Sequence, residues 1–331
     1  MKVLITGSSG SLGGMIASNL IAKKIPVIGV DIKESAENRF GEYFSFYNCS
    51  ITDKGGLEAI FKKEEPTHVI HLACTFNKVR NRQKEHYIDI GGSTNILEVS
   101  DKTTSVKQFI YSSSAAAYGA HSDNPEWINE TNPLRPGKYR YGVNKKLIED
   151  VYSQIPVRED LRLVFCRICT VIRPSFNRPA SVVSILLKLP WLPKFIRGNK
   201  VQFLHEEDFV SLINLIISDD QIKGIYNIAP DSYAVAKDLV PGKKFIRIPV
   251  FVITIGLGIL WYLKILNLEP AAIKVSIYPI LLDPAKIISR FNYKFKFSST
   301  EAFEDVKIHS IIQQYQNTTL TFDLNNHRST F

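Results

Sequence analysis

The chain opens with an apolar stretch followed by a glycine-rich turn, and this feature constrains its fold more than any other. Residues 3–5 are apolar without helical spacing, as in a strand that is buried on both faces. Gly7, Gly10 and Gly13 follow, and apolar residues then recur at helical intervals of three and four. A glycine-rich turn at a helix N-terminus binds phosphate, because bare N–H groups and the helix dipole point at the anion. The sequence therefore predicts a strand–turn–helix unit with a phosphate site.

An acidic residue at the end of the next strand extends this interpretation to a nucleotide. Residues 27–30 form a second apolar run, which ends in Asp31. A carboxylate there can accept hydrogen bonds from both ribose hydroxyls of an adenosine and would repel a 2′-phosphate. We therefore expect NAD to be preferred over NADP, with Lys33 softening the preference. The alternative is the same unit without a nucleotide, but the glycines lie between a strand and a helix, as a dinucleotide site requires.

Strands and helices alternate along the first half of the chain. Further strands are predicted at 43–49, 68–73, 106–111, 161–172, 201–204 and 224–228, and helices at 56–63, 87–99, 141–152 and 208–217. This pattern predicts an α/β fold, with a doubly wound Rossmann-type parallel sheet and a smaller, mostly helical C-terminal substrate region. We expect the NAD-binding domain at 1–172 and 201–229, and the substrate-binding region at 173–200 and 230–331. Ligands bind at the carboxyl ends of parallel strands, so Gly7, Asp31, Ala73 and Ser114 should share one cleft.

Composition narrows the possible partners. The 331 residues carry a net charge of +9, which fits nucleic acid, anionic lipid or an anionic small molecule. No block of Lys and Arg is longer than two residues, and no nucleic-acid motif is present. We therefore expect a small-molecule substrate and an anionic cofactor, and no nucleic-acid partner.

The cysteines and histidines predict no metal site. The chain has four cysteines, and the pair Cys166-x-x-Cys169 lies in an apolar, strand-like run without a second pair of ligands. We expect buried free thiols, and hence a reducing, cytoplasmic location. Because the first strand begins at Lys2, we expect no signal peptide.

A tyrosine and a lysine at helical spacing carry the predicted chemistry. Tyr141 and Lys145 would lie one turn apart on one helix face, where the ammonium should lower the phenol pKa towards neutrality. Ser114, at a strand end, can hydrogen-bond the same substrate oxygen. This trio suits proton transfer to or from a carbinol while a hydride moves to a nicotinamide. A surface pair is the commoner explanation of Tyr-x-x-x-Lys alone, but the glycine turn and the serine-rich strand end favour catalysis.

Several stretches resemble the extended short-chain dehydrogenase/reductases of the NAD-dependent epimerase/dehydratase kind, and the resemblance extends to about residue 306. The matching stretches are TGSSGSLG at 6–13, HLA at 71–73, SSSAAAYG at 112–119, YGVNK at 141–145 and HEED at 205–208, with later landmarks at 224–228 and 283–293. The resemblance implies hydride transfer on a sugar carbinol that is linked to a nucleotide, with Tyr141 as acid/base. Lys145 would bind the nicotinamide ribose and tune Tyr141, and Ser114 would position the reacting oxygen.

The resemblance also implies a set of binding residues. The expected cofactor-binding residues are Gly7, Ser9, Gly10, Ser11, Leu12, Gly13, Asp31, Ser50, Ile51, Leu72, Ala73, Cys74, Tyr141 and Lys145. The expected substrate-binding residues are Ser114 and Thr170. A homodimer is a further implication, and His205 and Asp208 are expected to serve structure.

Departures from the family pattern leave the substrate open. Ser50 stands where an aspartate is usual, Asp89 and Thr170 where asparagines are usual, and residues 200–204 lack a diphosphate-binding arginine. The cofactor half thus matches better than the nucleotide-sugar half. One alternative is a dehydrogenase or reductase of an apolar alcohol, sterol-like or isoprenoid. Another is a non-catalytic NAD-binding sensor or scaffold, against which the intact trio argues.

The longest apolar run, residues 248–263, contains no charge. As a helix it would extend about 24 Å, against about 30 Å for a hydrocarbon core. Pro249, Gly256 and Gly258 weaken such a helix, and a span would separate 283–293 from the cofactor domain, so we reject a transmembrane helix.

Two interpretations of this run stay open. The favoured one is a buried helix of the substrate region. The other is a helix on an anionic membrane surface, with Lys243, Lys244, Arg247 and Lys264 near lipid phosphates. Residues 185–197 have a similar mixture of apolar and basic side chains.

Overall fold

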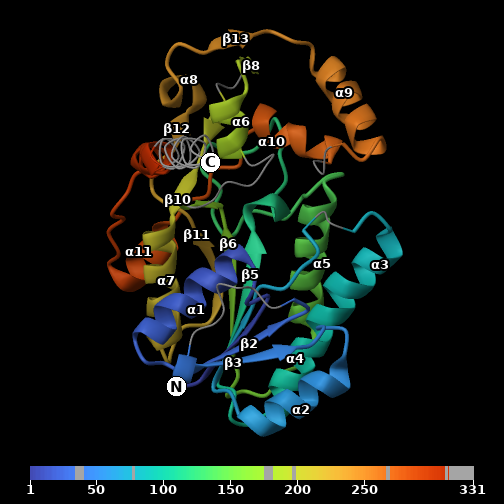
Figure 1. Ribbon diagram of the computed structural model, residues 1–331, viewed down its shortest axis with the longest axis vertical. Helices are drawn as coiled ribbons and strands as arrows, with labels where there is room; N and C mark the ends of the chain where they lie inside the picture. Colours follow the sequence, from blue (N-terminus) through green and yellow to red (C-terminus); the bar gives the residue numbers. More distant parts are fainter. Residues whose placement is uncertain are drawn as a thin grey trace, which may run out of the picture.

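A parallel sheet forms the centre of the molecule (Figure 1). The computed structural model describes residues 1–33, 41–76, 79–174, 182–195, 199–265, 269–309 and 312, apart from the side chain of Val182. Within these ranges the sheet has seven strands in the order β11-β6-β5-β4-β1-β2-β3, and every neighbouring pair is parallel. The strands are β1 (Val3–Thr6), β2 (Val27–Asp31), β3 (Phe44–Asn48), β4 (His68–His71), β5 (Gln108–Ser114), β6 (Arg162–Ile168) and β11 (Gly224–Ile228). The predicted Rossmann-type parallel sheet is therefore confirmed.

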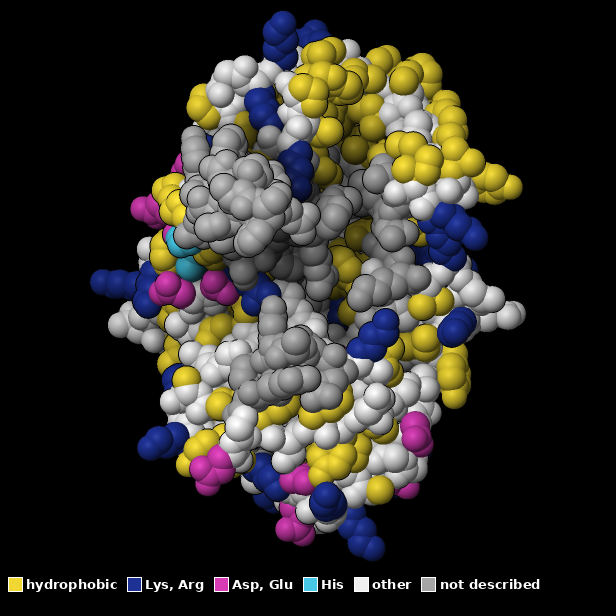
Figure 2. All heavy atoms as spheres, in the orientation of Figure 1, with side chains coloured by type: hydrophobic (Ala, Val, Ile, Leu, Met, Phe, Trp, Pro, Cys, Tyr) yellow, Lys and Arg dark blue, Asp and Glu magenta, His cyan; other side chains and the backbone are white. Residues whose placement is uncertain are grey.

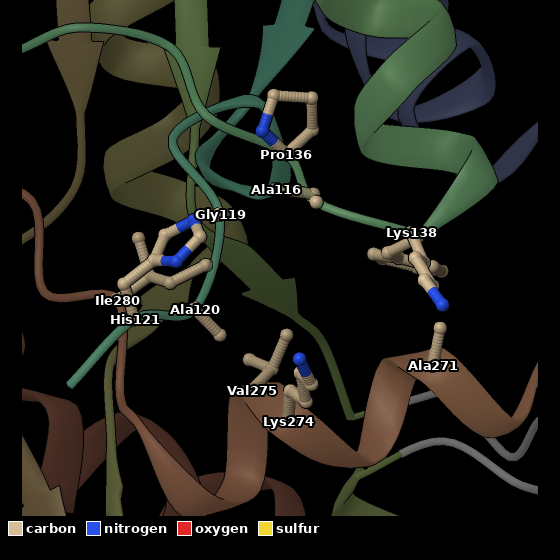
Figure 3. A pocket seen from close by; sticks show the side chains of 12 residues that line it. Ala116, Gly119, Ala120, His121, Pro136, Lys138, Ala271, Lys274, Val275 and Ile280 are labelled. Carbon is tan, nitrogen blue, oxygen red and sulfur yellow. The ribbon is translucent and has the colours of Figure 1, made fainter.

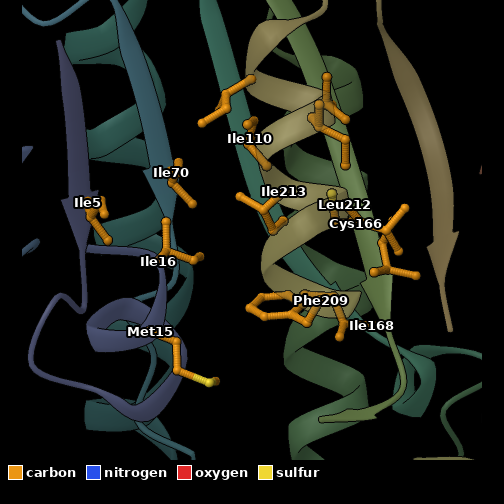
Figure 4. Close-up of a cluster of buried hydrophobic side chains, with 14 of the residues drawn as sticks. Ile5, Met15, Ile16, Ile70, Ile110, Cys166, Ile168, Phe209, Leu212 and Ile213 are labelled. Carbon is orange, nitrogen blue, oxygen red and sulfur yellow. The ribbon is translucent and has the colours of Figure 1, made fainter. Parts of the chain in front are cut away.

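Helices cover both faces of this sheet. The helices on one face are α1 (Ser11–Ala22), α7 (Glu206–Ser218) and α11 (Ala285–Phe291), and those on the other are α2 (Lys54–Glu64), α4 (Gly92–Lys102) and α5 (Arg140–Gln154). Alternate residues of a strand point to opposite faces, so Val3 and Ile5 join one apolar cluster and Leu4 the other. Figure 4 shows the first cluster, where Ile16 and Phe209 meet the sheet. Two covered faces explain why the strands have nearly continuous apolar sequences.

Short elements lie between the strands and the longer helices of the sheet. They are η2 (Gly41–Tyr43), α3 (Arg82–His86), η3 (Tyr87–Gly91) and η4 (Ala115–Ala117). The helix predicted at 87–99 therefore begins with the π-helical turn η3 and continues as α4. Such turns are rare and frequently occur at functional sites.

The rest of the chain forms short strands and helices at one end of the molecule (Figure 1). Three two-stranded sheets pair β7 (Thr170–Ile172) with β10 (Phe203–His205), β9 (Lys200–Val201) with β12 (Ala234–Val235), and β8 (Trp191–Pro193) with β13 (Lys244–Ile246). The helices are α6 (Val182–Lys188), α8 (Ala236–Leu239), α9 (Val250–Tyr262), η5 (Pro270–Ala272) and α10 (Ile273–Ile277), and residues 299–309 are also helical. The strand predicted at 161–172 is in fact two strands, because the chain leaves the central sheet at Cys169.

The long apolar run forms α9, and the structure contradicts its favoured interpretation as a buried helix. No residue of α9 is buried, and Phe251, Ile255 and Tyr262 are exposed. The reason is that α9 contacts the rest of the chain mainly at η5 and Arg80, which cover only part of its surface. In the described part of the chain, no helix combines the length and apolar character needed to cross a bilayer.

The four cysteines are free, as predicted. Cys166 is buried, whereas Cys49, Cys74 and Cys169 are half-buried, so the expectation of full burial holds for one thiol only. Burial raises the pKa of the Cys166 thiol to about 12, which makes it unreactive near neutral pH.

Candidate active site

The glycine turn between β1 and α1 is built by close backbone contacts. Gly7 has a φ of +72°, and a Cβ there would lie 2.9 Å from the amide nitrogen of Ala73. A Cβ on Gly13 would lie 2.3 Å from the carbonyl oxygen of Gly7, and Gly10 N–H donates to that same oxygen at 2.9 Å. Only glycine fits this left-handed, tightly packed turn without strain.

The N-terminus of α1 fits a dinucleotide phosphate. Gly10 is the N-cap residue, no side chain caps the helix, and the first turn holds no acidic residue. The turn that begins with Ser11 and Leu12 thus presents backbone N–H groups and the positive end of the helix dipole. These are the groups with which such a turn holds a pyrophosphate.

Asp31 lies at the carboxyl end of β2, beside the glycine turn. Its carboxylate accepts hydrogen bonds from the N–H of Ser9 at 3.1 Å and of Ile32 at 2.7 Å. Since the turn and Asp31 are linked in this way, a dinucleotide with its phosphates at α1 would have its adenosine ribose near the carboxylate.

The residues that follow β4 also border the glycine turn. Leu72 N–H donates to Thr6 O at 3.2 Å, and the Ala73 amide lies beside Gly7. Half-buried Leu72, Ala73 and Cys74 thus form one wall of the predicted cleft.

Ser50 and Ile51 follow β3, and the structure shows them in contact with protein residues other than those of the glycine turn. Ile51 is buried, its side chain packs where a Cβ on Gly92 would lie, and its carbonyl accepts from Asn95. The Ser50 hydroxyl lies 2.8 Å from that of Thr52. Ile51 thus lies against α4, and the contact of both residues with a cofactor stays a prediction.

The structure brings Ser114 and Tyr141 together. Ser114 ends β5 and Tyr141 lies in the first turn of α5, and the Ser114 side chain is close enough to lower the pKa of the Tyr141 phenol. This approach is possible because a Cβ on Gly142 would lie only 2.3 Å from Ala116 O. The ring of Phe76 packs edge-on against that of Tyr141, with centroids 4.9 Å apart.

Lys145 is buried one helical turn from Tyr141. Its ammonium donates to Ser112 O and lies 5.6 Å from the centre of the Tyr141 ring. The predicted lowering of the Tyr141 pKa is wrong for this structure. Burial raises the Tyr141 pKa well above its ordinary value and outweighs the opposite effect of the Ser114 side chain.

A buried carboxylate supports the start of α5, and the sequence analysis missed this role. Asp89, in the turn η3, accepts hydrogen bonds from Asn144 Nδ2 at 2.9 Å, Thr75 N–H at 2.8 Å and Thr75 Oγ1 at 3.0 Å. It thereby joins the segment after β4 to the helix that carries Tyr141. The departure at Asp89 was visible in the sequence, but its partners lie 14 and 55 residues away.

Thr170 lies at a strand edge next to the site. Ile168 is the register partner of Ser114, and Thr170 follows it at the exposed start of β7. A substrate could reach this side chain, so its predicted role in binding stays open to test.

The remaining histidine motif serves structure. His205 Nε2 lies 3.2 Å from Asp305, and the Asp208 carboxylate accepts from Tyr293 and from the N–H groups of Lys296 and Phe297. Among the described residues, no group of three potential metal ligands comes together.

A small cavity lies near α5, between the central-sheet part of the molecule and the C-terminal region. It has a volume of about 30 Å³ and lies between the loop after β5 and the η5–α10 segment (Figure 3). Tyr139, two residues before Tyr141, lines it together with Ala116 and Ala271. Glu269, just before η5, accepts a hydrogen bond from the N–H of Arg140 at 3.0 Å. The C-terminal region therefore contacts the start of the helix that carries Tyr141 and Lys145.

Comparison with known proteins agrees with this architecture. The NAD dependent epimerase/dehydratase family is matched over residues 3–229. A dTDP-D-glucose 4,6-dehydratase of Dictyostelium discoideum is 29% identical over 279 residues, which cover 75% of this chain and 62% of the relative. Protein CapI of Staphylococcus aureus is 34% identical over 138 residues, 38% of this chain and 41% of the relative. The chain thus covers less than two thirds of these curated relatives.

Solved structures share the fold. WbmG of Bordetella bronchiseptica, in complex with NAD and UDP, has a TM-score of 0.74 and 20% identity, with 93% of both chains covered. The UDP-glucose 4-epimerase of Thermotoga maritima, with UDP-glucose, has a TM-score of 0.72 and 24% identity, with 95% of this chain and 100% of the other covered.

Proposed function

Because the chain belongs to the NAD dependent epimerase/dehydratase family, we propose that it is an oxidoreductase of this type that acts on a nucleotide-linked sugar carbinol. The observation that carries the proposal is the proximity of Tyr141 to Ser114, which ends β5 at the same sheet edge as the glycine turn after β1. The relatives support the substrate class, since they include a dTDP-D-glucose 4,6-dehydratase and UDP-glucose 4-epimerases.

The cofactor site would be formed by the first half of the chain. The turn from Gly7 to Gly13 would hold the phosphates of NAD, and Asp31 would accept from the adenosine ribose. NAD, when bound, supplies the acceptor for the hydride of the carbinol. Retention of NAD through an oxidation and a following reduction would give epimerisation or dehydration without net consumption.

The proton would be handled by three side chains of this chain. Tyr141 would take the carbinol proton and return it, with Ser114 hydrogen-bonded to the same oxygen. Since burial raises the Tyr141 pKa, the phenol is protonated at neutral pH in this structure. Lys145 is the buried cation nearest to the ring in the described site, and its charge would favour the phenolate during proton transfer.

A dehydrogenase of an apolar alcohol is the second candidate, and the exposed apolar helix α9 favours it. This helix contacts η5, which borders the cavity of Figure 3. An apolar substrate could therefore approach from that side.

The two candidates, and a non-catalytic NAD-binding protein, can be separated by one experiment. The purified protein is incubated with NAD and panels of UDP-sugars, dTDP-sugars and apolar alcohols, with Ser114→Ala as the control. Conversion of a nucleotide sugar without net NADH formation supports the proposal. Stoichiometric NADH from an apolar alcohol would replace it with the second candidate, and NAD binding without any turnover would leave the non-catalytic one.

A homodimer and a cytoplasmic location are two further proposals. The first is implied by the family resemblance, and the second by the free thiols. Sedimentation velocity checks the dimer, and fractionation of cells checks the location.

A further inference from the structure

A large apolar surface lies at the end of the molecule opposite to α2. We call it the α9 surface, and its exposed side chains are Trp191, Ile246, Phe251, Val252, Ile255, Ile259, Tyr262 and Leu263. Tyr262 is 83% exposed and Phe251 66%. Figure 2 shows a concentration of apolar side chains over the end of the molecule where α9 lies. Contiguous apolar patches of this kind mark interaction sites, whereas scattered single residues do not.

The helix is held with one side outward. Phe251, Ile255 and Ile259 recur at intervals of four, so they form a stripe on one face. Near the end of α9, Arg80 lies 4.3 Å from the centre of the Trp261 ring and donates to Trp261 O. This contact anchors α9 to the loop after β4 and leaves the stripe facing solvent.

Basic residues flank the α9 surface, and acidic residues are absent from it. Lys244 and Arg247 precede the helix, Lys264 follows it, and all three are exposed. Residues 239–265 contain no Asp or Glu. Lys243 differs from the earlier expectation, because its ammonium donates to the carbonyls of Leu186, Leu187 and Leu189 and thus faces the protein.

We propose that the α9 surface binds the surface of an anionic lipid bilayer. Apolar side chains would enter the interface while the flanking cations meet lipid phosphates, as in interfacial helices. The thirteen residues of α9 extend only about 20 Å, so the helix lies in the interface and does not cross it. A second copy of the chain is the less suitable occupant, because two such surfaces would bring like charges together.

Docking by α9 would place the lipid surface near the C-terminal side of the candidate site. The helix contacts η5. Glu269, just before η5, accepts a hydrogen bond from the N–H of Arg140, the first residue of α5. The inference goes beyond the proposed function and does not depend on it, because lipid binding is measured without turnover.

Vesicle co-sedimentation tests the proposal. The full chain is mixed with vesicles of phosphatidylcholine alone or with phosphatidylglycerol, at low and high salt. We expect binding to the anionic vesicles at low salt and weaker binding at high salt. Lys244→Gln with Arg247→Gln should weaken it about thirtyfold, on a typical contribution of about 1 kcal/mol per cation. Lys23→Gln with Lys62→Gln, two exposed lysines of the cofactor half, should bind as the parent does.

The apolar part of the surface is tested separately. Ile255→Asn with Ile259→Asn should weaken vesicle binding at least about tenfold, whereas Leu215→Asn on the exposed side of α7 should not. Circular dichroism of each variant checks that the fold is intact.

Tryptophan fluorescence tests which side of the molecule touches lipid. Trp191 is 43% exposed and Trp261 lies in α9, so brominated lipid in anionic vesicles should quench tryptophan fluorescence, and Trp191→Phe should remove the part that comes from Trp191. Failure to bind anionic vesicles at low salt would overturn the proposal. Equal binding by all variants would show that another surface is used. Self-association that is lost in the isoleucine variant, without vesicle binding, would assign the surface to a second copy.

Discussion

Two apolar segments of the same chain differ in how far they are buried. Residues 3–5 in β1 are completely buried, whereas α9, which is longer and equally apolar, contains no buried residue. The strand lies between two layers of helices, whereas α9 contacts mainly η5 and Arg80 in the described part of the chain. Composition therefore predicts which segments are apolar enough to leave water. Whether the rest of the protein or another partner covers such a segment depends on the elements packed around it.

The first prediction measures this difference directly. Leu4→Ala leaves a cavity in a closed core and should lower the free energy of unfolding by about 2–5 kcal/mol. Ile255→Ala on α9 should change it by less than about 0.5 kcal/mol. Urea unfolding of both variants checks the pair, and comparable losses would mean that α9 is covered within the folded protein.

The second prediction places the chemistry in the cofactor half. Tyr141→Phe keeps the ring beside Phe76 but removes the exchangeable proton, so turnover should fall at least about a hundredfold while NAD still binds. Exposed Tyr87 provides the matched control, since Tyr87→Phe should leave turnover unchanged. Near-normal turnover of the Tyr141 variant would show that another group transfers the proton.

The third prediction concerns the preference of the cofactor-binding half for NAD over NADP. Asp31→Ala removes an acceptor for the ribose and a charge that repels a 2′-phosphate, so the preference for NAD over NADP should shrink about tenfold. Dissociation constants for both cofactors measure it. Tighter binding of NADP by the parent protein would refute the assigned role of Asp31.

The fourth prediction uses two histidines of the central sheet. Burial is the main cause that lowers the pKa of His71 to about 3 and that of His68 to about 4. Below about pH 6.5 the unfolded chain binds protons that the folded chain does not, so stability is full above that pH and falls as the pH decreases. The loss from pH 7 to pH 6 should be on the order of 1 kcal/mol. Urea midpoints at both pH values measure it, and a flat profile would contradict the buried, neutral state.

Much of the candidate site could be predicted because its residues belong to continuous motifs at strand ends. Gly7, Asp31, Ala73 and Ser114 each follow or end a parallel strand, and the sheet order brings those ends to one edge. Their convergence therefore follows from topology alone.

The unpredicted features depend on contacts between distant segments. The link from Asp89 to Asn144 joins two helices, and the raised pKa of Tyr141 comes from burial by surrounding residues. Lys243 is turned inward by the carbonyls of another segment, and α9 is exposed because no large element among the described residues lies over it. No local pattern of residue types encodes these arrangements.

The late position of β11 has a consequence for synthesis on the ribosome. The first six strands of the sheet are complete at Ile168, but β11, which pairs with β6, begins only at Gly224. At about 5–20 residues per second, β6 keeps an open edge for roughly 3–11 s as the chain emerges. An unpaired, apolar strand edge is a template for association with other chains. The interval before β11 emerges is therefore the stage of biogenesis at which this protein most needs protection from its neighbours.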